Sequence, residues 1–413
     1  MRRLPANADS KLGGALVILV TALIWLGCLR FPVVWQATGI GETSVPFLDL
    51  YGSLAAGEIA AQGGDPYRPN PLDPFHRPHL YSGWWLVTGT LGLTRADASW
   101  LGLTLILAGL ICAVVIIRPV TSVAAAQAVL VLCSPAILMA VNRGNNDWVV
   151  FILLCFALVG LRSPTRISQA AGAALIAVAT ALKYYPGAAF LALLSARTRR
   201  ESLGLLGICL LVGMLSVPAL LPGLQSVTRF APQPDGLYAF GAPVLFRNFA
   251  LPVIAGWLVP VVVILLAALG LAIPECRQAG GPTLEPEADR EFVFSAAVLT
   301  GCFFLGASYA YKLIFSLWML PALTQGHSST LVGRWRRPLW WILLASLWSE
   351  GLLALVINVV LTPLSRDAAL GTLSAALIIG PLLTWVLIVM LASRLLVYSW
   401  FHLRRLGLVA QRA

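Results

Sequence analysis

The feature that most constrains this chain is the series of apolar stretches that runs through nearly its whole length. A bilayer core about 30 Å thick is crossed by a helix of roughly 20 apolar residues. The chain has 413 residues, of which 59% are hydrophobic and 11% are charged, whereas a soluble domain carries about 25% charged residues. A single water-soluble core is therefore excluded. We expect an all-α, polytopic membrane helical bundle in which residues 1–413 form one transmembrane domain.

The basic residues indicate how the chain threads through the membrane. They give a net charge of +11, but they form short clusters between apolar stretches, which argues against a nucleic-acid partner. Short cytoplasmic loops are enriched in Lys and Arg. All basic clusters lie on the same side of the membrane only if the short stretch 80–93 does not cross it. This predicts about twelve transmembrane helices, with both termini cytoplasmic and the spans 184–196 and 310–325 short. The clusters are Arg2, Arg3 and Lys11; Arg118; Arg162 and Arg166; Arg197, Arg199 and Arg200; Arg334, Arg336 and Arg337; and Arg394, Arg404 and Arg405.

Three segments between the spans are long enough to form structure of their own. Residues 36–98 are expected to form an outer loop with interfacial helices, because 80–93 is too short and too rich in glycine to span. Residues 223–249, with their prolines, are expected to form a second outer loop. Residues 274–291 mix acidic residues with Gly and Pro, which predicts a solvated cytoplasmic linker.

The sequence lacks the common motifs of soluble catalysis, such as a Walker loop or His-Glu-x-x-His. His76 and His79 are not at convincing metal-ligand spacing, and six of the seven cysteines lie inside apolar stretches, as inert core residues do. We therefore expect no metal and no bound cofactor. Any chemistry must use the outer loops and the helix ends.

Asp49, just beyond the first span, is the first candidate for such chemistry. A carboxylate that is partly desolvated among apolar neighbours is a better general base. Because Asp49 precedes a helix-prone stretch at 50–62, these residues by themselves favour an N-cap over a base. The paired glycines and Asp-Pro step that follow predict the end of this helix and a turn before Tyr67.

Further polar residues lie at the outer ends of later spans. Arg143, Asn145 and Asp147 fall between two spans, where polar groups persist only if they are paired or face a wet cavity. Lys183 and Lys312 are two of only three lysines and both adjoin tyrosines, which suits a phosphate at headgroup depth as well as ordinary snorkelling. Glu350 lies near the middle of an apolar stretch and needs a partner or a proton.

Three segments, in this order and spacing, resemble the bacterial polytopic mannosyltransferase family that uses polyprenyl-phosphate sugars, within the membrane glycosyltransferases of GT-C architecture. They are Asp49–Tyr67, Arg143–Leu158 and Ala181–Leu194, and Arg247-Asn248 partly echoes a later polar motif. The resemblance implies that Asp49 is the catalytic base and that Lys183 lies near the donor phosphate.

The expected function is transfer of a sugar, mannose by this resemblance, from a polyprenyl-phosphate co-substrate to a lipid-linked or envelope glycan acceptor, with inversion at the anomeric carbon. The departing phosphate would be stabilised by cationic side chains without a metal. The partners expected are the lipid-linked donor, the acceptor and membrane lipids, and no nucleic acid. The alternatives are a secondary transporter or lipid flippase, and a non-catalytic subunit of an envelope assembly complex. The residues expected to bind donor phosphate are Lys183, Lys312 and Arg143, and those expected to bind acceptor or sugar are Asp65, Tyr67, Asn145, Asp147, Arg247 and Asn248.

Overall fold

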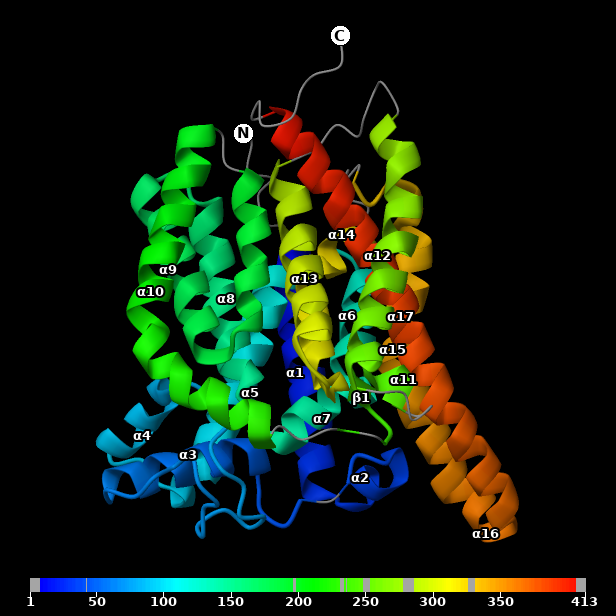
Figure 1. Cartoon of the computed structure of the whole chain (residues 1–413). Coiled ribbons are helices and arrows are strands. Elements are labelled where there is room, and N and C mark those ends of the chain that lie inside the picture. Colours follow the sequence, from blue (N-terminus) through cyan, green and yellow to red (C-terminus); the bar gives the residue numbers. More distant parts are fainter. Residues whose placement is uncertain are drawn as a thin grey trace.

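The described part of the chain is almost entirely helical. The computed structural model describes residues 8–41, 43–195, 198–230, 234, 236–247, 253–277, 286–325 and 331–405. Within these residues the only strands are β1 (Ala239–Phe240) and β2 (Ser308–Tyr309), which pair in antiparallel register. The long helices stand side by side, and short helices lie across one end of the bundle (Figure 1). The prediction of an all-α bundle is confirmed.

Six helices of the described residues are long and apolar enough to cross a membrane, and a seventh span is formed if the bent pair α6 (Ser122–Leu132) and α7 (Pro135–Arg143) counts as one. The six are α1 (Ala8–Arg30), α5 (Ala98–Ile117), α10 (Arg199–Phe230), α12 (Val253–Arg277), α15 (Arg336–Leu355) and α17 (Arg366–Arg405). Other helices of the bundle are shorter or less apolar, among them α8 (Asp147–Arg162), α9 (Arg166–Lys183) and α13 (Pro286–Leu305). The count of about twelve spans therefore stays a prediction.

The two ends of the bundle differ in the segments that they carry. α1 begins and α17 ends at the same end of the bundle, and α2 (Val33–Thr38), α3 (Leu48–Ala61) and α4 (Val87–Thr90) lie at the opposite end (Figure 1). This arrangement agrees with an outer loop at 36–98 on the side away from both termini. Which side faces the cytoplasm stays a prediction.

The stretch 80–93 forms only a short 3-10 helix, η1 (Gly83–Leu86), followed by α4. It lies against α3 through two glycines: a Cβ on Gly57 would come within 2.3 Å of Thr88 Oγ1 and 2.8 Å of the Gly89 nitrogen. Such close backbone approach is possible only without side chains. The Trp85 indole donates to the Leu182 carbonyl at 3.2 Å, which ties this layer to the end of α9.

Two segment boundaries differ from expectation. α10 continues to Phe230, although a loop was expected from residue 223, because Pro218 and Pro222 lie inside the helix without ending it. Proline in a helix interior removes one backbone hydrogen bond and bends the helix, but the hydrogen bonds of the adjacent turns allow the helix to continue.

The expected linker 274–291 is helical at both of its described ends. α12 extends to Arg277 and α13 begins at Pro286, and residues 278–285 lie outside the described part. One acidic residue of this region lies inside the bundle: the buried Glu291 carboxylate accepts a hydrogen bond from Arg118 at 2.6 Å and contacts Arg162.

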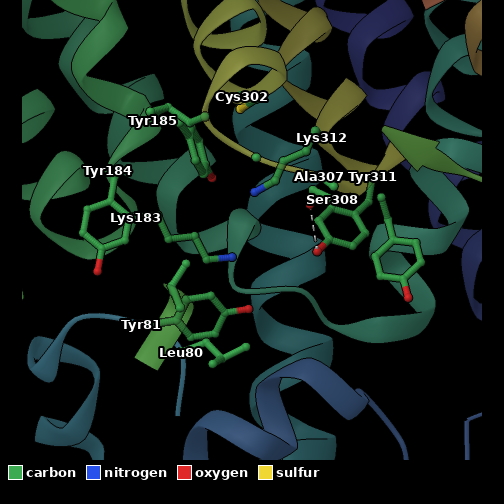
Figure 2. A pocket seen from close by; sticks show the side chains of 14 residues that line it. Leu80, Tyr81, Lys183, Tyr184, Tyr185, Cys302, Ala307, Ser308, Tyr311 and Lys312 are labelled. Carbon is green, nitrogen blue, oxygen red and sulfur yellow. Dashed lines mark hydrogen bonds between the residues drawn. The ribbon is translucent and has the colours of Figure 1, made fainter. Parts of the chain in front are cut away.

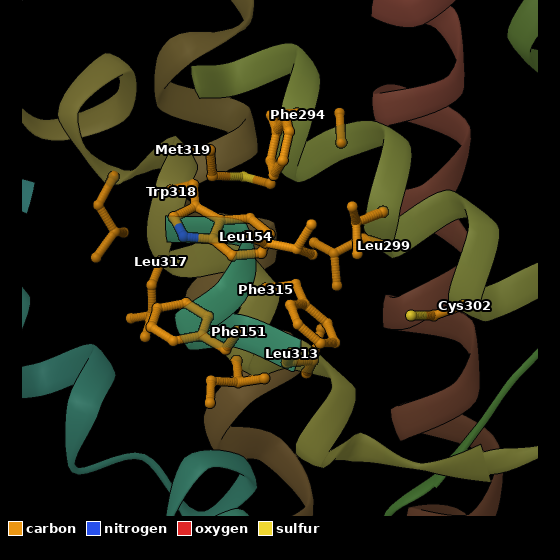
Figure 3. Packing of buried hydrophobic residues seen from close by; sticks show 14 of the residues in the cluster. Phe151, Leu154, Phe294, Leu299, Cys302, Leu313, Phe315, Leu317, Trp318 and Met319 are labelled. Atoms are coloured by element: carbon orange, nitrogen blue, oxygen red, sulfur yellow. The ribbon is translucent and has the colours of Figure 1, made fainter. Parts of the chain in front are cut away.

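A cluster of buried aromatic side chains packs inside the bundle (Figure 3). The rings of Phe151 and Trp318 stack with centroids 5.0 Å apart, and Phe294 and Phe315 meet Trp318 at 5.2 and 5.4 Å. These contacts hold the 3-10 helix η4 (Ala310–Met319), which is buried throughout, against α8 and α13. They thereby fix the position of Lys312 at the start of η4.

Candidate functional site

Asp49 is not an N-cap, so that alternative is wrong. α3 begins at Leu48, and the residue before it, Phe47, has a left-handed backbone (φ 52°) and makes no side-chain capping bond. Asp49 is therefore already in the first turn. Its carboxylate is directed at basic side chains from other segments.

The Asp49 carboxylate is nearly saturated with donors. Arg143 donates two hydrogen bonds, from Nε to Oδ2 and from Nη2 to Oδ1, both at 2.8 Å. Asn145 Nδ2 donates to Oδ2 at 2.6 Å, and Arg77 Nη1 lies 3.4 Å from Oδ1. Burial on its own would raise the pKa of Asp49, but the charge and hydrogen bonds of Arg143, with Arg77 and Asn145, outweigh burial and lower it.

Arg77 is itself held in place by two parts of the segment 36–98. Its guanidinium binds Asp73 at 2.8 Å and donates to the Leu48 carbonyl at 2.9 Å. Arg77 thus joins the loop at residue 73 to the start of α3, next to Asp49. Sequence reasoning assigned no role to Arg77 or Asp73, because Asp49, which Arg77 contacts, lies 28 residues from Arg77 along the chain.

Asn145 connects Asp49 to a second group of charges. The turn that carries it follows α7 and passes through Gly144, whose φ of 52° and close contact with Phe47 leave no room for a side chain. While Nδ2 of Asn145 binds Asp49, its Oδ1 accepts from Lys183 Nζ at 3.3 Å. One buried amide thus lies between the two acidic centres.

Asp147 forms the second acidic centre, at the start of α8. Its Oδ1 accepts from Lys183 Nζ at 2.6 Å and from the Tyr185 hydroxyl at 2.7 Å, and its Oδ2 lies 2.8 Å from Lys312 Nζ. All four side chains are buried. Two lysines share one carboxylate, so this group of three ionised side chains carries one uncompensated positive charge.

A cavity of about 190 Å³ adjoins the two lysines, whose ammonium groups point toward one another there (Figure 2). Lys183 Nζ lies 4.5 Å from the ring centre of Tyr81, and Lys312 Nζ lies 4.1 Å from that of Tyr185. Such cation–π contacts stabilise partly desolvated ammonium groups. The lining residues are Leu80, Tyr81, Lys183, Tyr184, Tyr185, Val227, Cys302, Leu305, Gly306, Ala307, Ser308, Tyr309, Tyr311 and Lys312.

The remaining candidates lie apart from these two acidic centres. Asp65 is exposed and organises its own turn by accepting from the Tyr67 N–H at 3.0 Å and pairing with Arg68. The Tyr67 ring packs against His79, and burial, with the charges of Tyr184 and Asp65, raises the pKa of Tyr67 to about 12.

Arg247 ends α11 (Val244–Arg247), and its side chain, like the whole of Asn248, lies outside the described residues.

His79 has a structural role in the described structure. Burial lowers its pKa to about 4, and its Nε2 lies 3.2 Å from the Ser82 carbonyl, which places the proton on Nε2 of a neutral ring. Among the described residues, no group of three or more His, Cys, Asp or Glu side chains is arranged to hold a metal ion.

No protein-family model matches the sequence, and no curated protein matches it.

Proposed function

We propose that this chain is a membrane glycosyltransferase of GT-C architecture, which moves a sugar from a polyprenyl-phosphate donor to a lipid-linked or envelope glycan acceptor. Mannose is the sugar by the resemblance in sequence, and the outer face of a bacterial cytoplasmic membrane is the place. The observation that carries the proposal is the pairing of a buried carboxylate, Asp49, with a cavity that holds a surplus of positive charge, connected through Asn145.

The charge of the lysine group suits the leaving group of this reaction. The donor is a phosphate diester with one negative charge, and the polyprenyl phosphate released from it carries about −1.5 to −2 at neutral pH. Negative charge therefore grows on the phosphate as the sugar departs. Preorganised cations at that position, Lys183 and Lys312, stabilise the transition state more than the bound donor.

In the proposed step, the oxygen of an acceptor hydroxyl attacks the anomeric carbon of the donor sugar. The bond from that carbon to the phosphate oxygen breaks, and its electron pair stays on the phosphate. The hydroxyl proton passes to the Asp49 carboxylate. One displacement of this kind inverts the configuration at the anomeric carbon.

The setting of the cavity suits a donor with a long lipid chain. Val227 near the end of α10 and Leu305 at the end of α13 line its rim, and 63% of Leu305 is exposed on the outside of the bundle. A headgroup held by Lys183 and Lys312 would leave its polyprenyl chain beside such apolar surface. A soluble sugar nucleotide has no lipid chain that could contact this apolar rim.

The decisive experiment is incubation of the purified full chain with radiolabelled polyprenyl-phosphate mannose and membrane lipid acceptors. We expect a labelled glycolipid and released polyprenyl phosphate. A well-folded preparation that forms neither product would contradict the proposal.

A lipid flippase is the second candidate, because buried ion clusters such as Asp147 with its two lysines also occur in transporters. It predicts movement of the lipid-linked sugar across sealed vesicles with the sugar–phosphate bond intact.

A further inference from the structure

A second cavity, of about 350 Å³, lies among the outer end of α1, α2 and the outer end of α5, and differs in chemistry from the first. Among the residues that the structure describes, no charged side chain lines it. Its wall combines two aromatic rings, Trp35 and Phe47, with three neutral polar side chains, Thr43, Ser99 and Asn142. The other lining residues are apolar: Leu26, Leu29, Pro32, Pro46 and Leu103.

Two of the lining residues are close in sequence to residues of the Asp49 site. Phe47 lies two residues before Asp49, and Asn142 directly precedes Arg143, which binds Asp49 through two hydrogen bonds. The side chain of Asn142 is buried, and its only hydrogen bond within the described residues is a long one, from Nδ2 to the Gly41 carbonyl at 3.4 Å. The amide oxygen of Asn142 therefore still has the capacity to accept a hydrogen bond from a ligand.

We propose that this second cavity binds the neutral sugar end of a lipid-linked acceptor and directs one of its hydroxyl groups toward Asp49. This inference rests on the proposed function and names the class of its second substrate. The donor phosphate and the acceptor sugar then occupy different cavities, one lined by lysines and one whose described lining residues carry no charge. Asp49 receives the proton of the hydroxyl that attacks the donor sugar.

The lining fits this class of ligand. Sugar rings present apolar C–H faces that pack on aromatic rings, and hydroxyl groups that require amide and hydroxyl partners. An anionic headgroup would find no counter-charge among the described lining residues, and burying a charge without one is costly. The volume lies within the roughly 300 to 1,000 Å³ of small-molecule sites. Leu26, 42% exposed on the outer half of α1, places one wall of the cavity at the lipid-facing surface, where the tail of a glycolipid can remain in the bilayer.

The test uses the full chain in lipid nanodiscs, because an alkyl glycoside detergent belongs to the same ligand class and would compete. The probes are dodecyl mannoside for the second cavity and dodecyl phosphate for the first cavity, lined by Lys183 and Lys312 and called the lysine cavity below. Ser99→Trp fills the mouth of the second cavity from an exposed position on α5, and Thr104→Trp adds the same side chain at an exposed position on that helix outside the lining. Asn142→Leu keeps the size of the side chain and removes its polar groups.

We expect Ser99→Trp to weaken mannoside binding at least about tenfold, and Asn142→Leu to weaken it about threefold to tenfold. Dodecyl phosphate binding should stay unchanged in both, and Thr104→Trp should bind both probes as the wild type does. Equal mannoside affinity in the wild type and both cavity variants, or no mannoside binding by the wild type, would overturn the inference.

A transfer assay separates this inference from the proposed function. If the wild type transfers sugar and Ser99→Trp keeps the acceptor KM of the wild type, the inference fails and the function stands. If mannoside binding depends on Ser99 and Asn142 but no sugar is transferred, the neutral-sugar site stands and the proposed function fails.

Discussion

The buried group of Asp147, Lys183 and Lys312 predicts a sharp asymmetry between two kinds of substitution. The intact group has a net charge of +1, because one carboxylate faces two ammonium groups at 2.6 and 2.8 Å. Lys183→Met lowers this charge to zero and leaves Asp147 paired with Lys312 and hydrogen-bonded to Tyr185. Asp147→Asn raises it to +2 and leaves two buried cations without a counter-ion.

The expected magnitudes differ accordingly. Removing the only carboxylate of a buried ion group costs about 3 to 5 kcal/mol, whereas Lys183→Met should cost about 1 kcal/mol, the net value of an ordinary hydrogen bond. The double variant Asp147→Asn/Lys183→Met has a charge of +1 again and should be more stable than Asp147→Asn alone. Donor binding should show the opposite order, with Lys183→Met more affected than Asp147→Asn. Losing a charge-assisted contact to phosphate weakens binding by roughly ten- to a hundredfold.

Stability is measured by thermal unfolding of the purified full chain, and donor use by saturation curves for the polyprenyl-phosphate sugar. Lys11→Met is the matched control, since Lys11 is exposed near the start of α1, at the far end of the bundle. The reasoning is refuted if Lys183→Met unfolds as readily as Asp147→Asn, or if its donor saturation curve equals that of the wild type.

Four further outcomes are expected. Asp49→Asn should lower transfer by about a hundredfold or more, and should also lower stability by about 1 to 3 kcal/mol, because its new NH₂ group faces donors; near-normal transfer would exclude Asp49 as the base. Because the arginines and Asn145 lower the pKa of Asp49 in the donor-free enzyme, a loss of transfer at limiting donor that is due to its protonation should appear only below the pH range in which ordinary aspartates titrate. A cysteine at Arg68, which is largely exposed, should be labelled only from the outer side, and labelling from the cytoplasm alone would invert the topology. Gly380→Ala should cost about 1 to 3 kcal/mol in a thermal unfolding assay, since its Cβ would lie 2.5 Å from the Glu350 carboxyl, and a cost near zero would show that this contact yields easily.

The sequence predicted the segments of the site better than its contacts. Apolar length alone marks α1, α5 and α10, and the paired glycines mark the end of α3. Hydropathy does not reveal pairing between residues far apart in the chain. The partner of Glu350 is an example: its carboxyl packs over Gly380 of α17 and accepts from the backbone N–H of Tyr238, 112 residues earlier in the chain (350 − 238).

The contacts of Lys183 and Lys312 also could not be predicted from the sequence. Each adjoins tyrosines in the sequence, and both phosphate binding and snorkelling were compatible with that pattern. The structure places both ammonium groups inside the bundle on Asp147, which excludes snorkelling to the membrane surface. Asp147 was expected to bind sugar or acceptor, yet its two oxygens are occupied by lysines and Tyr185. Its place in the described structure is to hold the two cations together.

Arg143 was expected to bind the donor phosphate, but in the structure it binds Asp49 and lies beside the cavity proposed for that phosphate. Its guanidinium holds Asp49 through two bonds of 2.8 Å and also lies 5.2 Å from the ring centre of Tyr309, which lines the lysine cavity. A carboxylate held this way has a low pKa and accepts a proton poorly. Under the proposed function, a donor phosphate in the cavity would compete with Asp49 for Arg143, and each hydrogen bond that Asp49 loses makes it a stronger base. The same arginine would then couple occupation of the donor site to activation of the base, so that an acceptor hydroxyl is deprotonated only when a sugar is present to receive it.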